Sequence, residues 1–139
     1  MKRVIVSGAF DDLRFRDYRF IEEASKLGTL HVLLWSDDAV KAATGTAPKF
    51  PQAEREYSMQ AIRYVSSITL LHGANNPDAL PKIDAEPAPD IWAVPQSADT
   101  PAKRAWASKS GTGLGYRVIS DATLNIVPPA PPVPDNPQS

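Results

Sequence analysis

The chain has 139 residues, with 15 Lys and Arg against 16 Asp and Glu, which gives a formal net charge of −1 at pH 7. This is the length of one domain, and so balanced a charge produces no overall field that would attract nucleic acid or an acidic membrane surface. The absence of cysteine excludes disulfides, thiolate metal sites and a cysteine nucleophile. No apolar run approaches the roughly 20 residues of a membrane span, and the apolar stretch at 3–7 is too short for a signal peptide. We therefore expect a soluble, cytoplasmic protein.

Proline is concentrated at the C-terminal end, where six of the 14 prolines fall within residues 128–139. This segment has no periodic apolar pattern, and proline cannot donate a backbone hydrogen bond to a helix or a strand ladder. We expect residues 1–127 to form the domain and residues 128–139 to form a disordered tail. A proline-rich ligand for a partner domain is the alternative interpretation of the tail.

The N-terminal third of the chain predicts a strand, a loop, a helix and a second strand. The first strand, 3–7, ends at Gly8, and the loop covers 9–15. Phe20, Ala24 and Leu27 share one face of a helix over 16–27, and Gly28 follows as a C-terminal capping residue. The near-continuous apolar run at 30–35 is typical of a strand that is covered on both faces.

The rest of the domain repeats this alternation. Pro51 precedes a predicted helix over 52–66, and Thr100 with Pro101 predicts an N-cap and the first residue of a helix that ends near Gly111. The remaining predicted elements are a loop with a short helix at 39–50, a weak helix at 77–83, and strands at 68–71, 91–94 and 116–119.

Strands separated by helices predict an α/β fold, in this case a Rossmann-like, three-layer fold with a five-stranded, mostly parallel sheet. Ligands of such sheets bind outside the carboxyl ends of the strands. The segments 7–11, 36–38 and 95–99 are therefore the expected surroundings of a site.

Several of these segments carry recognisable motifs in the right order. Gly8-Ala9-Phe10-Asp11 follows the first strand, Phe20-Ile21-Glu22-Glu23-Ala24 and Leu27-Gly28 lie in the first helix, and Pro51-Gln52-Ala53-Glu54-Arg55, Ile62-Arg63-Tyr64-Val65 and Pro89 to Val94 come later. Over residues 3–119 the chain resembles the cytidylyltransferase-like nucleotidyltransferase superfamily, and it is most similar to the small glycerol-3-phosphate and ethanolamine-phosphate cytidylyltransferases.

The chain departs from the family where the family carries its chemistry. The positions of the His-x-Gly-His motif hold Arg14-Phe15-Arg16-Asp17. Residues 95–99 replace a Gly-Asp turn, and residues 119–123 only partly match the helix start that holds the triphosphate.

The resemblance implies a reaction in which a phosphomonoester oxygen attacks the α-phosphate of a nucleoside triphosphate and releases pyrophosphate. Such catalysis depends on positioning and on stabilising the charge of the transferred group. Arg14 can replace one histidine by its permanent charge and forked donors, so Arg14 and Asp17 are the catalytic candidates. The nucleotide-binding candidates are Gly8, Ala9, Phe10, Asp11, Arg16, Lys49, Arg55 and Arg63. No metal site of the protein's own is predicted, and Mg²⁺ is expected only if nucleotidyl transfer is retained.

Each candidate also has an ordinary structural interpretation. Asp17 suits the first turn of a helix, Asp11 suits a turn, and arginines at 14 and 16 suit a solvated surface. Arg55 and Arg63 suit a helix surface or an interface.

Three hypotheses remain open. The first is a diverged nucleotidyltransferase-fold protein that binds a nucleotide or phosphorylated metabolite at the first βα turn, with the standard reaction made doubtful by the missing histidines. The second is a non-catalytic interaction or regulatory subunit, and the third is a different enzyme on the same scaffold that uses Asp11 and Asp17. The resemblance also implies a homodimer.

Overall fold

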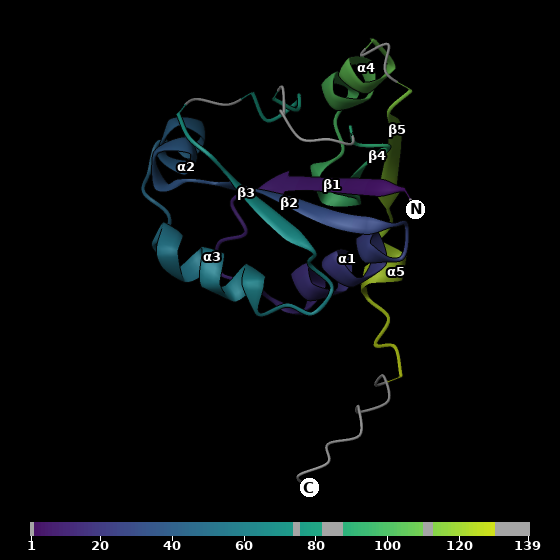
Figure 1. Cartoon of the computed structure of the whole chain (residues 1–139), viewed down its shortest axis with the longest axis horizontal. Helices are drawn as coiled ribbons and strands as arrows, with labels where there is room; N and C mark the ends of the chain where they lie inside the picture. The colour runs from purple at the N-terminus through teal and green to yellow at the C-terminus, as the bar shows by residue number, and fades with distance from the viewer. Residues whose placement is uncertain (1, 74–75, 82–87, 110–112, 130–139) are drawn as a thin grey trace, which may run out of the picture.

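Five parallel strands form one sheet in the order β3-β2-β1-β4-β5, as the computed structural model of the protein shows (Figure 1). The structure describes residues 2–73, 76–81, 88–109 and 113–129. The strands are β1 (Arg3–Gly8), β2 (Thr29–Trp35), β3 (Ser67–Leu71), β4 (Ile91–Pro95) and β5 (Gly115–Ile119). All four pairings are parallel, so the predicted Rossmann-like α/β fold is confirmed.

Helices cover both faces of this sheet. They are α1 (Phe15–Ser25), α2 (Asp37–Thr44), α3 (Gln52–Gln60), α4 (Pro101–Lys109) and α5 (Asp121–Leu124), with a short 3₁₀ turn, η1 (Gln96–Ala98). In Figure 1, α1, α3 and α5 lie below the sheet and α4 lies above it, while α2 lies beyond the tip of the β1 arrow, at the carboxyl edge. None of the helices in the described ranges is long and apolar enough to cross a membrane.

Alternating side chains of β1 pack into two separate apolar cores, one on each face of the sheet. Val4 and Val6 are fully buried against α1 and α3, whereas Ile5 is fully buried on the other face. On that second face the Trp92 ring meets Trp106 of α4 and Tyr116 edge-on, with centroids 5.7 and 5.5 Å apart. Because β1 is buried on both sides, its sequence is continuously apolar rather than alternating.

Gly28 serves a different purpose from the predicted capping role. Helix α1 ends at Ser25, with Lys26 as its C-cap, and the chain then turns into β2 close to the start of β1. A Cβ atom at Gly28 would lie 2.2 Å from the Lys2 carbonyl oxygen, which accepts a hydrogen bond from the Thr29 N–H. The close approach of two backbones therefore requires glycine here.

Two helix predictions need correction. The helix predicted over 52–66 ends at Gln60, because the Ser66 N–H already donates to the Leu30 carbonyl at 2.9 Å and the chain must turn beforehand to reach the sheet. Pro77 to Ala79 form a turn instead of the predicted helix start, and residues 82 and 83 lie outside the described residues. The predicted end of α4 near Gly111 and residues 130–139 of the tail also lie outside the described residues.

The predicted N-cap of α4 is confirmed, since the Thr100 hydroxyl oxygen accepts the Lys103 N–H at 3.1 Å. This bond satisfies one of the backbone donors that a helix leaves unpaired in its first turn.

His31 is a buried histidine that links β2 to the edge strand β3. Its Nδ1 atom is hydrogen-bonded to the Ser67 hydroxyl, and its Nε2 atom lies 2.8 Å from the Thr69 hydroxyl oxygen. Burial, and secondarily the positive charge of Arg3, lowers the pKa of His31 below its ordinary value. The folded protein therefore favours the neutral imidazole more than the unfolded chain does.

The free energy of unfolding should consequently fall as the pH drops from about 7.5 to about 5.5. In that window the unfolded chain takes up the His31 proton first, so stability is lost, by at most about 1.4 kcal/mol per pH unit for one proton. Urea titrations across the range measure this slope. His31→Gln should flatten it and His72→Gln should not; an unchanged slope in His31→Gln would contradict the assignment.

Candidate functional site

The loop that follows β1 has a strained backbone. Phe10 and Asp12 adopt φ angles of 47° and 57°, in the left-handed region that residues other than glycine rarely occupy. Each such residue costs on the order of 1 kcal/mol or more, so neighbouring contacts must hold the loop in place. A side chain at position 8 would cause no steric clash, because a Cβ atom there would contact only the Phe10 ring, at 3.6 Å.

Asp11 is the first of these contacts. One of its carboxylate oxygens accepts the Lys49 N–H at 2.6 Å and the other accepts the Phe50 N–H at 2.9 Å. Both oxygens are thus used to join the loop after β1 to the segment between α2 and α3. This placement matches the turn interpretation of Asp11 and brings Lys49 to the loop.

Arg14 and Lys49 converge on one oxygen atom of Asp12. The Arg14 guanidinium lies 2.7 Å and the Lys49 ammonium 3.1 Å from Asp12 Oδ2, and both cations are largely exposed to solvent. Hydrogen bonds from Arg14, and then from Lys49, hold the pKa of Asp12 below its usual value, and Asp12 raises the pKa of Arg14 in return. Two cations thus share one carboxylate, while the carboxylates of Asp11 and Asp17 accept the backbone N–H groups of Lys49 and Arg14.

The two other residues of the altered motif point elsewhere. The Asp17 carboxylate accepts the backbone N–H of Arg14 at 2.8 Å, which caps the start of α1. The Arg16 guanidinium forms an ion pair with Asp121, in the first turn of α5. The Asp121 N–H in turn donates to the side-chain oxygen of Gln96, at 3.0 Å. Arg16 therefore ties the first turn of α1 to the carboxyl ends of β4 and β5.

Arg55 is buried under the site, with only 2% of its surface exposed. Its Nη1 atom donates to the carbonyls of Ala9 and Trp35 at 2.8 and 2.7 Å, and its Nε atom donates to the Phe50 carbonyl at 2.9 Å. Its Nη2 atom donates to Asp37, at 2.8 Å. The guanidinium thus connects the ends of β1 and β2 to α2 and to the Lys49–Phe50 segment.

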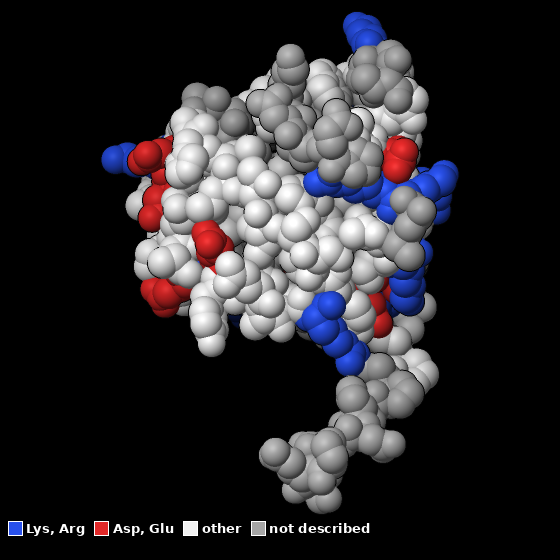
Figure 2. Space-filling view, in the orientation of Figure 1, with Lys and Arg blue, Asp and Glu red and all other residues white. Residues whose placement is uncertain are grey.

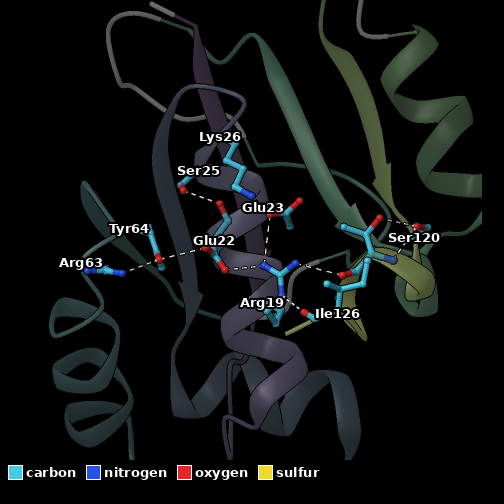
Figure 3. Close-up of polar contacts among 10 residues, drawn as sticks. Arg19, Glu22, Glu23, Ser25, Lys26, Arg63, Tyr64, Ser120 and Ile126 are labelled. Carbon is cyan, nitrogen blue, oxygen red and sulfur yellow. Dashed lines mark hydrogen bonds and ion pairs between the residues drawn. The ribbon is translucent and has the colours of Figure 1, made fainter. Parts of the chain in front are cut away.

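Arg63 is not brought to this site. It lies near the amino end of β3, where its Nη2 atom donates to the Tyr64 hydroxyl at 3.0 Å, and that hydroxyl donates to Glu22 at 3.3 Å (Figure 3). The sequence placed Arg63 among the nucleotide-binding candidates by resemblance alone. In the structure it faces α1, while the other candidates gather at the opposite end of the sheet.

Arg19 is a structural residue that the sequence interpretation missed. It is buried in α1 and its Nη1 atom donates to Glu22 at 2.5 Å, while Nε and Nη2 donate to the carbonyls of Ile126 and Thr123 at 2.7 and 3.2 Å (Figure 3). It thereby fixes the chain that follows α5. A signal was present in the sequence, because Glu22 and Glu23 stand three and four residues after Arg19.

A cavity of about 250 Å³ opens beside the Asp12 cluster. Its lining is mixed, with four apolar or aromatic side chains and four charged or polar ones. The lining residues are Phe10, Asp12, Leu13, Tyr18, Phe50, Glu54, Arg55 and Ser58. They come from the β1 loop, α1, the segment before α3, and α3 itself, so no local motif could have predicted the cavity.

Across the residues that the structure describes, no group of three or more histidine, aspartate or glutamate side chains is arranged to hold a metal ion. The cations of the site are instead those of Arg14 and Lys49, joined by Asp12. The arrangement is suited to binding an anion, because two exposed donors already meet at one negatively charged oxygen atom.

Replacing Arg55 should destabilise the protein strongly. Arg55→Met leaves three carbonyls and the Asp37 carboxylate without their donors, so we expect a loss of about 3 kcal/mol or more in the free energy of unfolding. Chemical denaturation measures it, with the exposed Arg63→Met as the matched control, expected within about 0.5 kcal/mol of the unmodified protein. An equal loss of unfolding free energy in the two variants would show that the hydrogen bonds of Arg55 do not hold these segments together.

Comparison with known proteins gives three curated relatives that bear the name FAD synthase, whereas no family model matches the chain. The chain is 29% identical to that of Pyrococcus horikoshii over 119 residues, which covers 84% of this chain and 78% of the relative. It is 36% identical to that of Pyrococcus abyssi over 69 residues, 49% of this chain and 47% of the relative. For Thermococcus kodakarensis the identity is 31% over 94 residues, 66% of this chain and 60% of the relative.

Among solved structures, the fold is similar to that of a lipopolysaccharide core biosynthesis protein from Thermoplasma volcanium GSS1. The TM-score is 0.62 at 20% identity, over 86% of this chain and 95% of the other. This likeness agrees with the parallel five-stranded sheet. The resemblance of the chain to the cytidylyltransferase-like nucleotidyltransferase superfamily is therefore supported by its sequence relatives and by its fold.

Proposed function

We propose that the protein binds a nucleotide or a phosphorylated metabolite at the loop after β1, through Arg14 and Lys49. The observation that supports this most directly is the meeting of both cations at Asp12 Oδ2. A phosphate oxygen has the same charge and the same hydrogen-bonding capacity as that carboxylate oxygen, and it can take its place between the two donors.

Nucleotidyl transfer is, in this proposal, lost or very slow. The superfamily's reaction needs donors aimed at the α-phosphate, and each lost donor typically costs about 10²–10³ in rate. Both motif histidines are absent, Arg16 is paired with Asp121, and the Asp17 carboxylate caps α1. Of the three positions that depart from the motif, Arg14 provides a largely exposed guanidinium, which pairs with the cavity-lining Asp12. Mg²⁺ belongs to the proposal only if transfer is retained.

A non-catalytic interaction or regulatory subunit is the second candidate function. In favour of this function, the exposed cations near the loop are already paired with carboxylates of the protein, and a ligand would have to compete with them. Arg14 and Lys49 share Asp12, and Arg16 pairs with Asp121. The third hypothesis, an enzyme that uses Asp11 and Asp17, is less well supported, because both oxygens of Asp11 accept backbone N–H groups. The proline-rich tail is a candidate contact for a partner.

A thermal-shift titration tests phosphate binding. We expect one of CTP, ATP, GTP, UTP, ribose 5-phosphate or glycerol 3-phosphate, with or without Mg²⁺, to raise Tm by several degrees, since ligand at 100 times its Kd adds about 2.7 kcal/mol of stability. FAD is included because of the relatives' name. Arg14→Ala should abolish the shift and Arg63→Ala should preserve it.

The absence of a shift with every one of these ligands would contradict the binding proposal and favour the interaction subunit. For any ligand that binds, a pyrophosphate-release assay follows. Rapid release would contradict the proposed loss of nucleotidyl transfer, without affecting the proposed binding site.

The homodimer implied by the resemblance also belongs to this proposal. Strand β3 is at one edge of the sheet, so one side of its backbone has no strand neighbour. Figure 2 shows few charged side chains over the middle of the face that carries β3 in Figure 1, with acidic ones toward α2 and α3. Light scattering on the eluted protein should give about 30 kDa, twice the 15.1 kDa chain; a mass near 15 kDa would contradict the dimer.

A further inference from the structure

We infer that Asp12 is an internal competitor of the bound anion: its carboxylate occupies the place between Arg14 and Lys49 and must leave before a phosphate can bind there. This inference rests on the proposed function, because the phosphate is taken to bind at the same two cations. It goes further by assigning a regulatory role to Asp12, which sets how much anion is needed to fill the site. Asp12 is not among the site residues that the sequence predicts.

The Asp12 carboxylate is held by side chains that a ligand can reach. Its Oδ2 atom accepts hydrogen bonds from the Arg14 guanidinium at 2.7 Å and from the Lys49 ammonium at 3.1 Å. The side chains of Arg14 and Lys49 are 72% and 61% exposed, and that of Asp12 is 33% exposed. Because ion pairs between exposed side chains contribute little net stability, a phosphate from solution can displace the carboxylate without disrupting the fold.

The two cationic residues do not depend on Asp12 for their positions. The Lys49 backbone N–H donates to Asp11 at 2.6 Å, and the Arg14 backbone N–H donates to Asp17 at 2.8 Å. Since these two carboxylates hold the backbones, Lys49 and Arg14 both remain beside the loop when the Asp12 carboxylate moves away. Asp11 and Asp17 therefore have structural roles, whereas Asp12 is the carboxylate that occupies the cations.

The conformation of the loop also favours the release of Asp12. Its φ angle of 57° lies in the left-handed region, which is uncommon for residues other than glycine. When the carboxylate leaves the cations, the backbone at Asp12 can relax toward a more favourable conformation. The cavity of about 250 Å³, whose wall includes Asp12, leaves room beside the carboxylate for this movement. The loop therefore has a closed arrangement with Asp12 on the cations and an open one with an anion in its place.

The place of Asp12 in the sequence makes it an effective competitor. It is two residues from Arg14, and a group on so short a connection acts at an effective concentration on the order of millimolar or above. The apparent affinity for phosphate then equals the intrinsic affinity multiplied by the fraction of molecules in which Asp12 has left the cations. Hydrogen bonds from Arg14, and then from Lys49, hold the pKa of Asp12 below its usual value, so the competing carboxylate is charged at neutral pH.

Removing the charge of Asp12 tests the competition directly. Asparagine has nearly the same shape and also tolerates left-handed backbone angles, so Asp12→Asn preserves the loop while it weakens the contacts with both cations. We expect calorimetric titration of the full chain with inorganic phosphate, at low ionic strength, to show at least about tenfold tighter binding by Asp12→Asn than by the unmodified protein. Asp12→Gly, which suits the same φ angle, should give a similar gain.

Two control variants separate competition from a general effect of charge. Asp38→Asn removes one exposed carboxylate from the first turn of α2, at the same edge of the sheet, and should change the phosphate affinity by less than about twofold. In the Arg14→Ala protein, the further substitution Asp12→Asn should not restore phosphate binding, because one of the two donors is then missing.

The possible results distinguish this inference from the proposed function. Equal gains in affinity from Asp12→Asn and Asp38→Asn would overturn the competition and leave the phosphate site standing. Unchanged or weaker binding by both Asp12→Asn and Asp12→Gly would do the same, because Asp12 would then support the site. Phosphate binding by neither the unmodified protein nor the Asp12 variants would overturn the phosphate site together with the competition.

Discussion

The buried guanidinium of Arg55 is the interaction on which the carboxyl edge of the sheet depends. A charged group with 2% exposure is tolerated only when its donors are satisfied, and here they reach Ala9, Trp35, Phe50 and Asp37. Those four acceptors lie on four different segments, which come together at one point. A single side chain therefore sets the relative positions of the β1 loop, the end of β2, the start of α2 and the Lys49–Phe50 segment.

This clamp explains how a loop with unfavourable backbone angles can persist. The left-handed conformations of Phe10 and Asp12 are unfavourable in isolation, but the Ala9 carbonyl is held by Arg55 and the Asp11 carboxylate is held by two backbone N–H groups. The loop presents Asp12 to Arg14 and Lys49 as a consequence. Local strain is thus compensated by hydrogen bonds from residues that are distant in the sequence.

The periodicity of the sequence was sufficient to predict the strands and the parallel sheet, because strands such as β1 and β2 are mainly apolar and are separated by helical patterns. Periodicity failed to predict the end of α3, which depends on a long-range contact. The Ser66 N–H donates to the Leu30 carbonyl, so the chain must leave the helix earlier than its local pattern indicates. At the site, Lys49 and Arg14 lie close together as expected for one binding region, whereas Arg63 does not join them. The cavity could not be predicted, since its walls come from four separate segments.

The altered motif shows how a binding edge can change its chemistry while the fold is preserved. The positions of the family's His-x-Gly-His motif now hold side chains with three different roles: Arg14 contributes an exposed cation, Arg16 joins the first turn of α1 to α5, and Asp17 caps α1. Two of these roles are structural, and they replace donors that would face a transferred phosphoryl group with contacts inside the protein. The largely exposed charges of Arg14 and Lys49 meet at Asp12. Our proposal of binding without efficient transfer follows from this arrangement, because two cations can position an anion, whereas transfer also needs donors aimed at the transferred group.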